Sequence, residues 1–268
     1  MAQSETISSA SNPLVKGVRR AIARGGLTDD GLCVAESFHL LEEALRSDCT
    51  VRVVLAARSV ESAVQAHVRQ LAGIRLAVLP DALFQSMAGT ESSQGIMALI
   101  VPSSWTLDQL FRGRSLVIVL DGVQDPGNAG TIVRAAEAFG ASGVLFLKGT
   151  ASPYNPKALR ASAGSLFRVP FVHMIDAELA RAAFQQKKLD VYASVPFSSS
   201  NHVKPLVYAD LTRKCAVIIG SEGRGVSEKL HAGAIDLAIP TAGVESLNAA
   251  MAASVILYEA RRQRSLKP

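Results

Sequence analysis

Along most of the chain, short apolar runs alternate with stretches in which apolar positions recur at helical spacing. In the first hundred residues this pattern predicts strands at 32–35, 51–56, 76–79 and 96–101. It predicts helices at 37–46 and 60–71. Strands and helices mixed in this way are typical of a small α/β layer structure.

A polar break follows this region. Pro102, Ser103 and Ser104 interrupt the pattern, and the stretch up to Arg114 has no strong apolar period of its own. The sequence therefore predicts two domains, residues 1–104 and residues 113–268.

The second region contains continuous apolar runs, which are typical of strands buried on both faces of a parallel sheet. The predicted strands are 116–120, 144–147, 189–195, 216–219 and 235–239, and the clearest helices are 129–139 and 177–187. Because strands and helices alternate, right-handed crossovers in a parallel sheet are expected. The fold class is therefore α/β, with a parallel-sheet domain after a smaller α/β domain.

The last ordered stretch reads as strand, loop and helix. Pro240 ends the strand, residues 241–245 form the loop, and a long helix is expected to begin at Ser246, a favoured N-cap residue. Asn248 would then lie inside the first turn, at a strand's carboxyl end, where open α/β sheets bind ligands. An ordinary buried helix with a serine cap is the alternative. The face expected to pack inward comprises Leu247, Ala250, Met251, Ser254, Val255 and Tyr258.

Two further loops place polar residues at strand ends. One ends on Asn128, expected to be the N-cap of the helix that carries Arg134. The other, IIGSEGRG at 218–225, has the glycine spacing GxxGxG, which is neither a P-loop nor a dinucleotide fingerprint. Its glycines allow a ligand to approach the main chain, although a plain turn explains them as well. Asn128 could equally be only a cap, Arg134 only a partner of Glu137, and Glu222 only a support for its own turn.

Composition and charge add modest constraints. The 268 residues are 49% hydrophobic, enough for one or two packed domains, and the net charge is +5 with a pI near 9.3. Residues 1–112 carry 10 basic and 11 acidic side chains, whereas residues 113–268 carry 18 and 12. The excess permits a nucleic-acid partner. Lys16, Arg19, Arg20 and Arg24 form either an RNA-touching arm or a solvated helix face, and we favour the solvated face.

Several classes of protein lack support in the sequence. Cys33, Cys49 and Cys215 are scattered without metal-ligand spacing, and the five histidines lie apart from the polar loops. There is no HExxH or GxSxG motif and no apolar run long enough to cross a bilayer. We therefore expect no metal, no membrane partner and a cytoplasmic location.

Three segments in order resemble the motifs of one family. NAGTIVRAAEAFG (128–140), IIGSEGRGVS (218–227) and IPTAGVESLNAAMAASVILYEA (239–260) look like those of the SpoU/TrmH RNA ribose 2′-O-methyltransferases of the SPOUT class. NPKALRASAGSLF (155–167) is similar to the segment after the first motif. ESFHLLEEAL (36–45) and ESSQGIMALI (91–100) resemble, more softly, the substrate-binding domain that many members carry in front.

The resemblance implies a trefoil knot, S-adenosylmethionine held in the knot's loops, and a homodimer. The positions matching cofactor contacts are Gly220, Ile239 and Leu247, and Gly223 joins them because it also lets an adenosyl group approach the main chain. The positions matching the catalytic centre are Asn128, Arg134, Glu222, Ser246 and Asn248.

The leading hypothesis is a methyltransferase that acts on a ribose 2′-OH, with large-subunit rRNA as substrate because the family's tRNA enzymes generally lack the front domain. A tRNA enzyme and a non-catalytic RNA-binding protein of the same fold are the alternatives. A nicotinamide-dependent oxidoreductase would need the missing GxGxxG motif. Since a guanidinium keeps its proton at ordinary pH, Arg134 is expected to act as a cation and not as a base.

Overall fold

The computed structural model describes residues 3–68, 73–90, 92–197 and 202–265. The chain divides into two compact units, and each unit is discontinuous in sequence. Unit 1 comprises Met1–Ser104 with Tyr154–Phe167, and unit 2 comprises Trp105–Pro153 with Arg168–Pro268. The assignment of separate functions to residues 1–104 and 113–268 stays a prediction.

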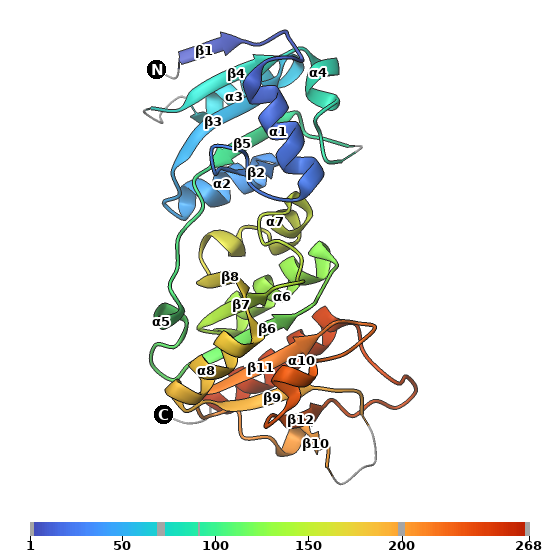
Figure 1. Cartoon of the computed structure of the whole chain (residues 1–268). Coiled ribbons are helices and arrows are strands. Elements are labelled where there is room, and N and C mark those ends of the chain that lie inside the picture. The colour runs from blue at the N-terminus through green and yellow to red at the C-terminus, as the bar shows by residue number, and fades with distance from the viewer. Residues whose placement is uncertain (1–2, 69–72, 91, 198–201, 266–268) are drawn as a thin grey trace. The chain divides into compact units, whose positions relative to one another are not determined.

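Unit 1 is built on a five-stranded mixed sheet (Figure 1). Its order is β1 (Gln3–Thr6), β4 (Arg75–Leu79), β3 (Val51–Ala57), β5 (Ile96–Ile100) and β2 (Cys33–Glu36). β4 runs parallel to β1 and β3, whereas β5 is antiparallel to β3 and β2. The four strands expected from the apolar runs are confirmed; β1 lies in the polar start and was not expected.

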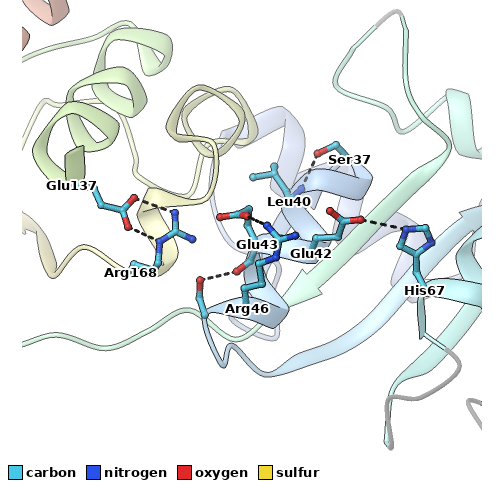
Figure 2. Close-up of polar contacts among 9 residues, drawn as sticks. Ser37, Leu40, Glu42, Glu43, Arg46, His67, Glu137 and Arg168 are labelled. Atoms are coloured by element: carbon cyan, nitrogen blue, oxygen red, sulfur yellow. Dashed lines mark hydrogen bonds and ion pairs between the residues drawn. The ribbon is translucent and has the colours of Figure 1, made fainter.

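Within residues 3–104, the described helices of unit 1 are α1 (Pro13–Arg24), α2 (Phe38–Arg46), α3 (Glu61–Val68) and α4 (Asp81–Gln85), with the short turn η1 (Arg58–Val60). Ser37 caps α2, because its Oγ accepts a hydrogen bond from the Leu40 N–H at 3.1 Å (Figure 2). The basic segment near the N-terminus forms α1, which buries Val15, Val18 and Ala21. It is therefore a surface helix with a packed inner face.

A segment from the second half of the sequence completes unit 1. It contains α7 (Pro156–Ser162) and the turn η2 (Ser165–Phe167). Arg160 Nη1 lies 3.0 Å from the carboxylate of Glu36, which is only 3% exposed. The same carboxylate accepts hydrogen bonds from the Gly89 N–H and the Thr90 hydroxyl, both at 3.2 Å. Because a buried carboxylate needs such partners, α7 supplies a charge that this unit requires.

Unit 2 contains a seven-stranded parallel sheet. Its order is β10 (Lys204–Pro205), β12 (Ile235–Ala238), β9 (Asp190–Ser194), β11 (Cys215–Gly220), β6 (Leu116–Asp121), β7 (Gly143–Leu147) and β8 (Phe171–Ile175) (Figure 1). All neighbouring pairs are parallel. The five expected strands and the parallel sheet are confirmed. β8 and β10 are edge strands with partly exposed residues, which explains their weak apolar signal.

The helices of unit 2 are α5 (Leu107–Leu110), α6 (Pro126–Phe139), α8 (Ala177–Lys187), α9 (Glu228–His231) and α10 (Ala249–Ser265); η3 (Leu206–Tyr208) is a short turn. α10 packs against α6 and β11. Val117 and Val119 of β6 pack in one cluster with Leu110 and Phe184. No helix in the described part of the chain is both long and apolar enough to cross a membrane.

α6 begins at Pro126, earlier than expected, and Asn128 is not its N-cap. Asp125 is the cap, since its Oδ1 accepts hydrogen bonds from the N–H groups of Gly127 at 2.5 Å and Asn128 at 3.1 Å. Pro126 suits the first helical position because that position needs no N–H donor. Asn128 therefore lies in the first turn with its amide available for other contacts.

α10 begins at Ala249, so the prediction that it starts at Ser246 is wrong. Asn248 is the N-cap: its Oδ1 accepts from the N–H groups of Ala250 at 2.9 Å and Met251 at 3.3 Å. Of the expected inward face, Ala250 is buried as predicted, but the face as a whole is turned. Small residues let α10 approach its neighbours closely, and the buried positions are Ala249, Ala250, Ala253, Ile256, Leu257 and Ala260. The larger side chains Met251, Val255 and Tyr258 remain exposed.

Candidate active site

A cleft of about 560 Å³ opens at the carboxyl ends of β9, β11 and β12. This is the edge at which open parallel sheets bind ligands. The lining comes from four segments of unit 2 and comprises residues 194–197, 219–225, 239 and 241, and 245–249, with Ala252.

Glycine is required at position 220 by the loop itself. A Cβ on Gly220 would lie 2.1 Å from the carbonyl carbon of Gly225. The loop folds back on itself because the Ser221 and Gly225 main chains exchange hydrogen bonds of 3.1 and 2.8 Å. Gly225 has a φ of +68°, which favours glycine. The plain-turn interpretation therefore accounts for Gly220, whereas Gly223 has open space around it and leaves the main chain accessible from the cleft.

β6 holds the far end of this loop. The Asp121 carboxylate, at the last position of β6, accepts a hydrogen bond from the Ser227 N–H at 2.7 Å. Asp121 also pairs in register with Gly220 across the sheet. The loop that carries Glu222 is thus fixed at both ends.

Three polar side chains from three segments far apart in the sequence meet beside the cleft. Asn128 Nδ2 donates to Glu222 Oε1 at 2.6 Å, and Asn248 Nδ2 donates to Asn128 Oδ1 at 3.2 Å. The Asn248 oxygen is already used as the cap of α10. Asn128 therefore connects Glu222 to the start of α10. The interpretation of Asn128 as only a cap is wrong, and so is that of Glu222 as a support only for its own turn.

The other expected residues of the C-terminal loop also lie at the cleft. Ile239, Ser246 and Leu247 line it, together with Gly220, Gly223, Glu222 and Asn248. Ser246 is exposed, and its hydroxyl makes no hydrogen bond with the described residues. That hydroxyl can therefore receive a ligand or a substrate group.

Arg134 does not line the cleft, and unlike Asn128 it has no hydrogen bond to any of the described residues that do. It is exposed on α6 and has no ion pair or hydrogen bond among the described residues. Its proposed partner Glu137 instead binds Arg168, with two N–O distances of 2.5 and 3.0 Å (Figure 2). The alternative interpretation, in which Arg134 only pairs with Glu137, is therefore wrong for the described residues.

One lining segment was missed in the sequence. Ser194, Val195, Pro196 and Phe197 follow β9 and form part of the wall. Pro196 directly after an apolar run marks a strand end, which was the available signal. Its placement beside the other loops depends on β9 lying between β11 and β12, and strand order cannot be read from an apolar pattern.

The cleft suits a small organic ligand better than a metal ion. Its volume falls in the range of roughly 300–1,000 Å³ usual for such sites. Apolar side chains of Ile219, Ile239 and Leu247 face it together with main chain at Gly220 and Gly223. In the described part of the chain, no His, Cys, Asp and Glu residues gather in a group that could hold a metal.

Residues 115–258 match the model of the SpoU rRNA Methylase family, and residues 12–98 match that of the MRM3-like substrate binding domain. The chain belongs to the SpoU rRNA methylase family. The match covers every segment that lines the cleft, from Ser194 to Ala252.

Characterised and uncharacterised relatives of similar length support this membership. An uncharacterized tRNA/rRNA methyltransferase of Synechocystis is 35% identical over 97% of this chain and 94% of its own length. The 23S rRNA guanosine 2′-O-methyltransferase RlmP of Bacillus subtilis is 31% identical, with 95% and 98% covered. The SpoU methyltransferase AviRb of Streptomyces viridochromogenes, solved with AdoMet, superposes with a TM-score of 0.82 at 25% identity and 95% and 98% coverage.

Proposed function

We propose that this SpoU family protein transfers a methyl group from S-adenosylmethionine to a ribose 2′-OH of large-subunit rRNA. The observation that carries the proposal is the Asn128–Glu222–Asn248 network beside a ligand-sized cleft. The relative RlmP, named as a 23S rRNA 2′-O-methyltransferase, and the AdoMet complex of AviRb support the substrate and the cofactor.

Gly220, Gly223, Ile239 and Leu247 would hold the cofactor. The open main chain at Gly223 admits close approach, and Ile239 and Leu247 offer apolar contact within the cleft. When bound, S-adenosylmethionine supplies an electrophilic methyl group. The chain's own contribution is to exclude water and to orient the acceptor hydroxyl.

Ser246 and Glu222 are the side chains best placed to receive that hydroxyl. Ser246 has a free hydroxyl at the cleft, and the Asn128 amide fixes the Glu222 carboxylate in one orientation. Asn248 uses its oxygen as a helix cap and its amide to hold Asn128, so its role is to position Asn128. Preorganised polar groups of this kind lower a barrier because they need not reorient during reaction.

We infer that the protein is a homodimer through α10. Met251 and Tyr258 are each 58% exposed and Val255 is 40% exposed, which leaves an apolar stripe along one side of the helix. α6, which carries Arg134, packs against α10, so a second copy on this stripe would lie beside Arg134. Arg134 would then serve a site completed only in the dimer. Light scattering of Val255→Glu should show monomers, whereas Arg181→Glu on α8 should remain dimeric.

The strand order is consistent with the trefoil knot implied by the resemblance. β11 is inserted between β6 and β9, β12 lies beyond β9, and the chain then returns to pack α10 on α6. We propose that this return threads the loops that line the cleft. The three free cysteines are compatible with the expected cytoplasmic location.

The deciding experiment is transfer of labelled methyl from S-adenosylmethionine to RNA from a strain that lacks the gene, followed by mapping of the modified nucleotide. Label in the large-subunit rRNA supports the proposal, and label only in tRNA would move the substrate to the alternative class. Binding of RNA and cofactor without transfer would indicate a non-catalytic protein. Calorimetry should detect S-adenosylmethionine and not NAD.

Substitutions that keep or remove the positive charge test the role of Arg134. Arg134→Lys keeps the cation and loses the planar fork, so it should retain more single-turnover activity than Arg134→Ala. Both variants should bind the cofactor. If both are equally inactive and the wild-type rate follows an ionisation that disappears only with Arg134, the arginine acts as a base instead.

A further inference from the structure

Basic side chains gather at the edge of the unit 2 sheet opposite the cleft. β9, β11 and β6 are neighbours and run parallel, so their amino ends share one edge. The loops leading into these strands and the last turns of α10 carry nine basic residues, which we call the basic edge: Arg112, Arg114, Lys187, Lys188, Arg213, Lys214, Arg261, Arg262 and Arg264.

Arg264 joins these loops to α10. Its guanidinium donates to the carbonyl oxygens of Leu211 at 2.8 Å, Arg114 at 2.6 Å, Ser115 at 3.1 Å and Arg213 at 2.7 Å. Arg114 in turn donates to the Arg264 carbonyl at 3.2 Å. The loops before β6 and β11 are therefore held in one rigid arrangement.

Acidic side chains neutralise only part of the basic edge. Asp108 pairs with Lys187 at 2.7 Å, Asp190 with Arg213 at 3.2 Å, and Glu259 with Arg262 at 2.7 Å. Asp210 is the remaining acid in these loops, and it accepts hydrogen bonds from Thr212.

Six cations of the basic edge form no ion pair with the described residues: Arg112, Arg114, Lys188, Lys214, Arg261 and Arg264. Arg114 and Arg264 donate to main-chain carbonyl oxygens, and the other four are exposed and have no carboxylate partner among the described residues. A fixed cluster of unneutralised cations attracts a polyanion. Six of the nine basic residues are arginines, whose planar fork matches phosphate oxygens.

We propose that the basic edge binds the phosphate backbone of the RNA substrate. The inference rests on the proposed function for the identity of the polyanion. β11 has six residues, so the basic edge lies roughly 20 Å from the cleft and contacts RNA remote from the reacting ribose. Contacts to phosphate increase the affinity for RNA and fix the position of the RNA on the protein, but they do not distinguish one base sequence from another.

The test is the salt dependence of binding to a large-subunit rRNA transcript between 50 and 200 mM salt. Arg112→Gln/Lys214→Gln removes two cations that have no partner to lose. Each phosphate contact contributes roughly 0.7 to 0.9 to the slope of log affinity against log salt, so the slope should fall by about 1.5. The dissociation constant at the lower salt should rise about tenfold.

Arg181→Gln/Lys204→Gln is the matched control. It also removes two exposed cations of unit 2 that form no ion pair with the described residues, but on α8 and β10 away from the basic edge. This control should keep the wild-type slope, and all proteins should bind S-adenosylmethionine equally in calorimetry.

Equal slopes for the two double variants would overturn the inference and leave the proposed function standing. If light scattering showed that Arg112→Gln/Lys214→Gln no longer forms a dimer, the basic edge would be a protein–protein interface and the inference would be overturned. A wild type without RNA affinity would overturn both proposals.

Discussion

The two glycines Gly220 and Gly223 lie three positions apart in one loop and have opposite environments. A Cβ at position 220 meets main-chain atoms within 2.4 Å, whereas a Cβ at position 223 meets nothing within 4 Å. We expect Gly220→Ala to lower the melting temperature and abolish cofactor binding, because backbone cannot move aside cheaply. Gly223→Ala should leave the melting temperature within a degree or two of wild type. Equal melting temperatures for the two variants in calorimetric scans would contradict the loop geometry.

Cys215 links stability to alkaline pH. Burial raises the pKa of this thiol to about 11, despite the opposing effect of nearby Arg264. The unfolded thiol ionises near 9.0, so the unfolded state releases its proton first and stability falls as pH rises from about 9 to 11. Thermal midpoints measured across this window should decline, and Cys215→Ala should flatten the decline. Cys33, whose pKa burial raises to about 12, contributes in the same direction and remains in that variant.

Polar residue types at strand ends singled out Glu222 and Ser246, and the family resemblance added Leu247. All three line the cleft. Arg134 was expected there and lies elsewhere, because its position on α6 points it to the surface. A sequence motif can identify a residue as a candidate for the site. Whether its side chain reaches the cleft depends on how the helices and strands pack.

At the scale of elements, the start of α10 combines two roles in one side chain. Asn248→Asp should keep the helix cap, because a carboxylate oxygen can still accept from the N–H groups of Ala250 and Met251. It should lose the amide that holds Asn128, so methyl transfer should fall at least tenfold at nearly unchanged stability. Asn248→Ala should lose both and also be destabilised by about 1 kcal/mol.

Denaturant unfolding and single-turnover assays separate these outcomes. Ser246→Ala is the control for stability, since its side chain caps nothing in the described structure. If Ser246→Ala were as unstable as Asn248→Ala, the helix would begin where the sequence first suggested.

The types of most elements were predictable, but the starts of α6 and α10 were not. Each loop offers two capping residues, Asp125 and Asn128 before α6, and Ser246 and Asn248 before α10. Pro126 was a usable signal for the first choice, because proline favours the first helical position. For α10, the residue that acts as cap also contacts Asn128, which lies 120 positions away in the sequence. A rule based on neighbouring residues cannot predict such a contact.

At the scale of the whole molecule, the ion pair between Glu36 and Arg160 joins distant parts of the chain into unit 1. Arg160→Met would leave a carboxylate that is 3% exposed without its cation, and we expect a loss of about 3 kcal/mol in unfolding free energy. Glu36→Gln/Arg160→Met should recover much of it. Arg75→Met, which breaks the exposed pair with Glu5, should cost under about 1 kcal/mol.

Circular dichroism in urea measures these differences. Equal losses for Arg160→Met and Arg75→Met would show that burial of Glu36 carries no penalty. The apolar pattern correctly placed four strands of unit 1 and five of unit 2, yet it could not show that residues 154–167 belong with residues 1–104. The packing of residues 154–167 on unit 1 depends on burial and charge contacts between distant parts of the chain. The periodicity of apolar residues within one segment carries no information about such contacts.

The discontinuity of the two units has a consequence for biosynthesis. Residues 1–104 leave the ribosome first, but α7 and its Arg160 follow only after β6, α6 and β7 have been made. At roughly 5–20 residues per second, the interval between Ser104 and Phe167 lasts about 3 to 13 s. During that time the nascent first unit exposes an unneutralised Glu36 and an uncovered surface to chaperones. The cleft can form only later, because Asn248 and α10 are the last of its lining segments to be synthesised.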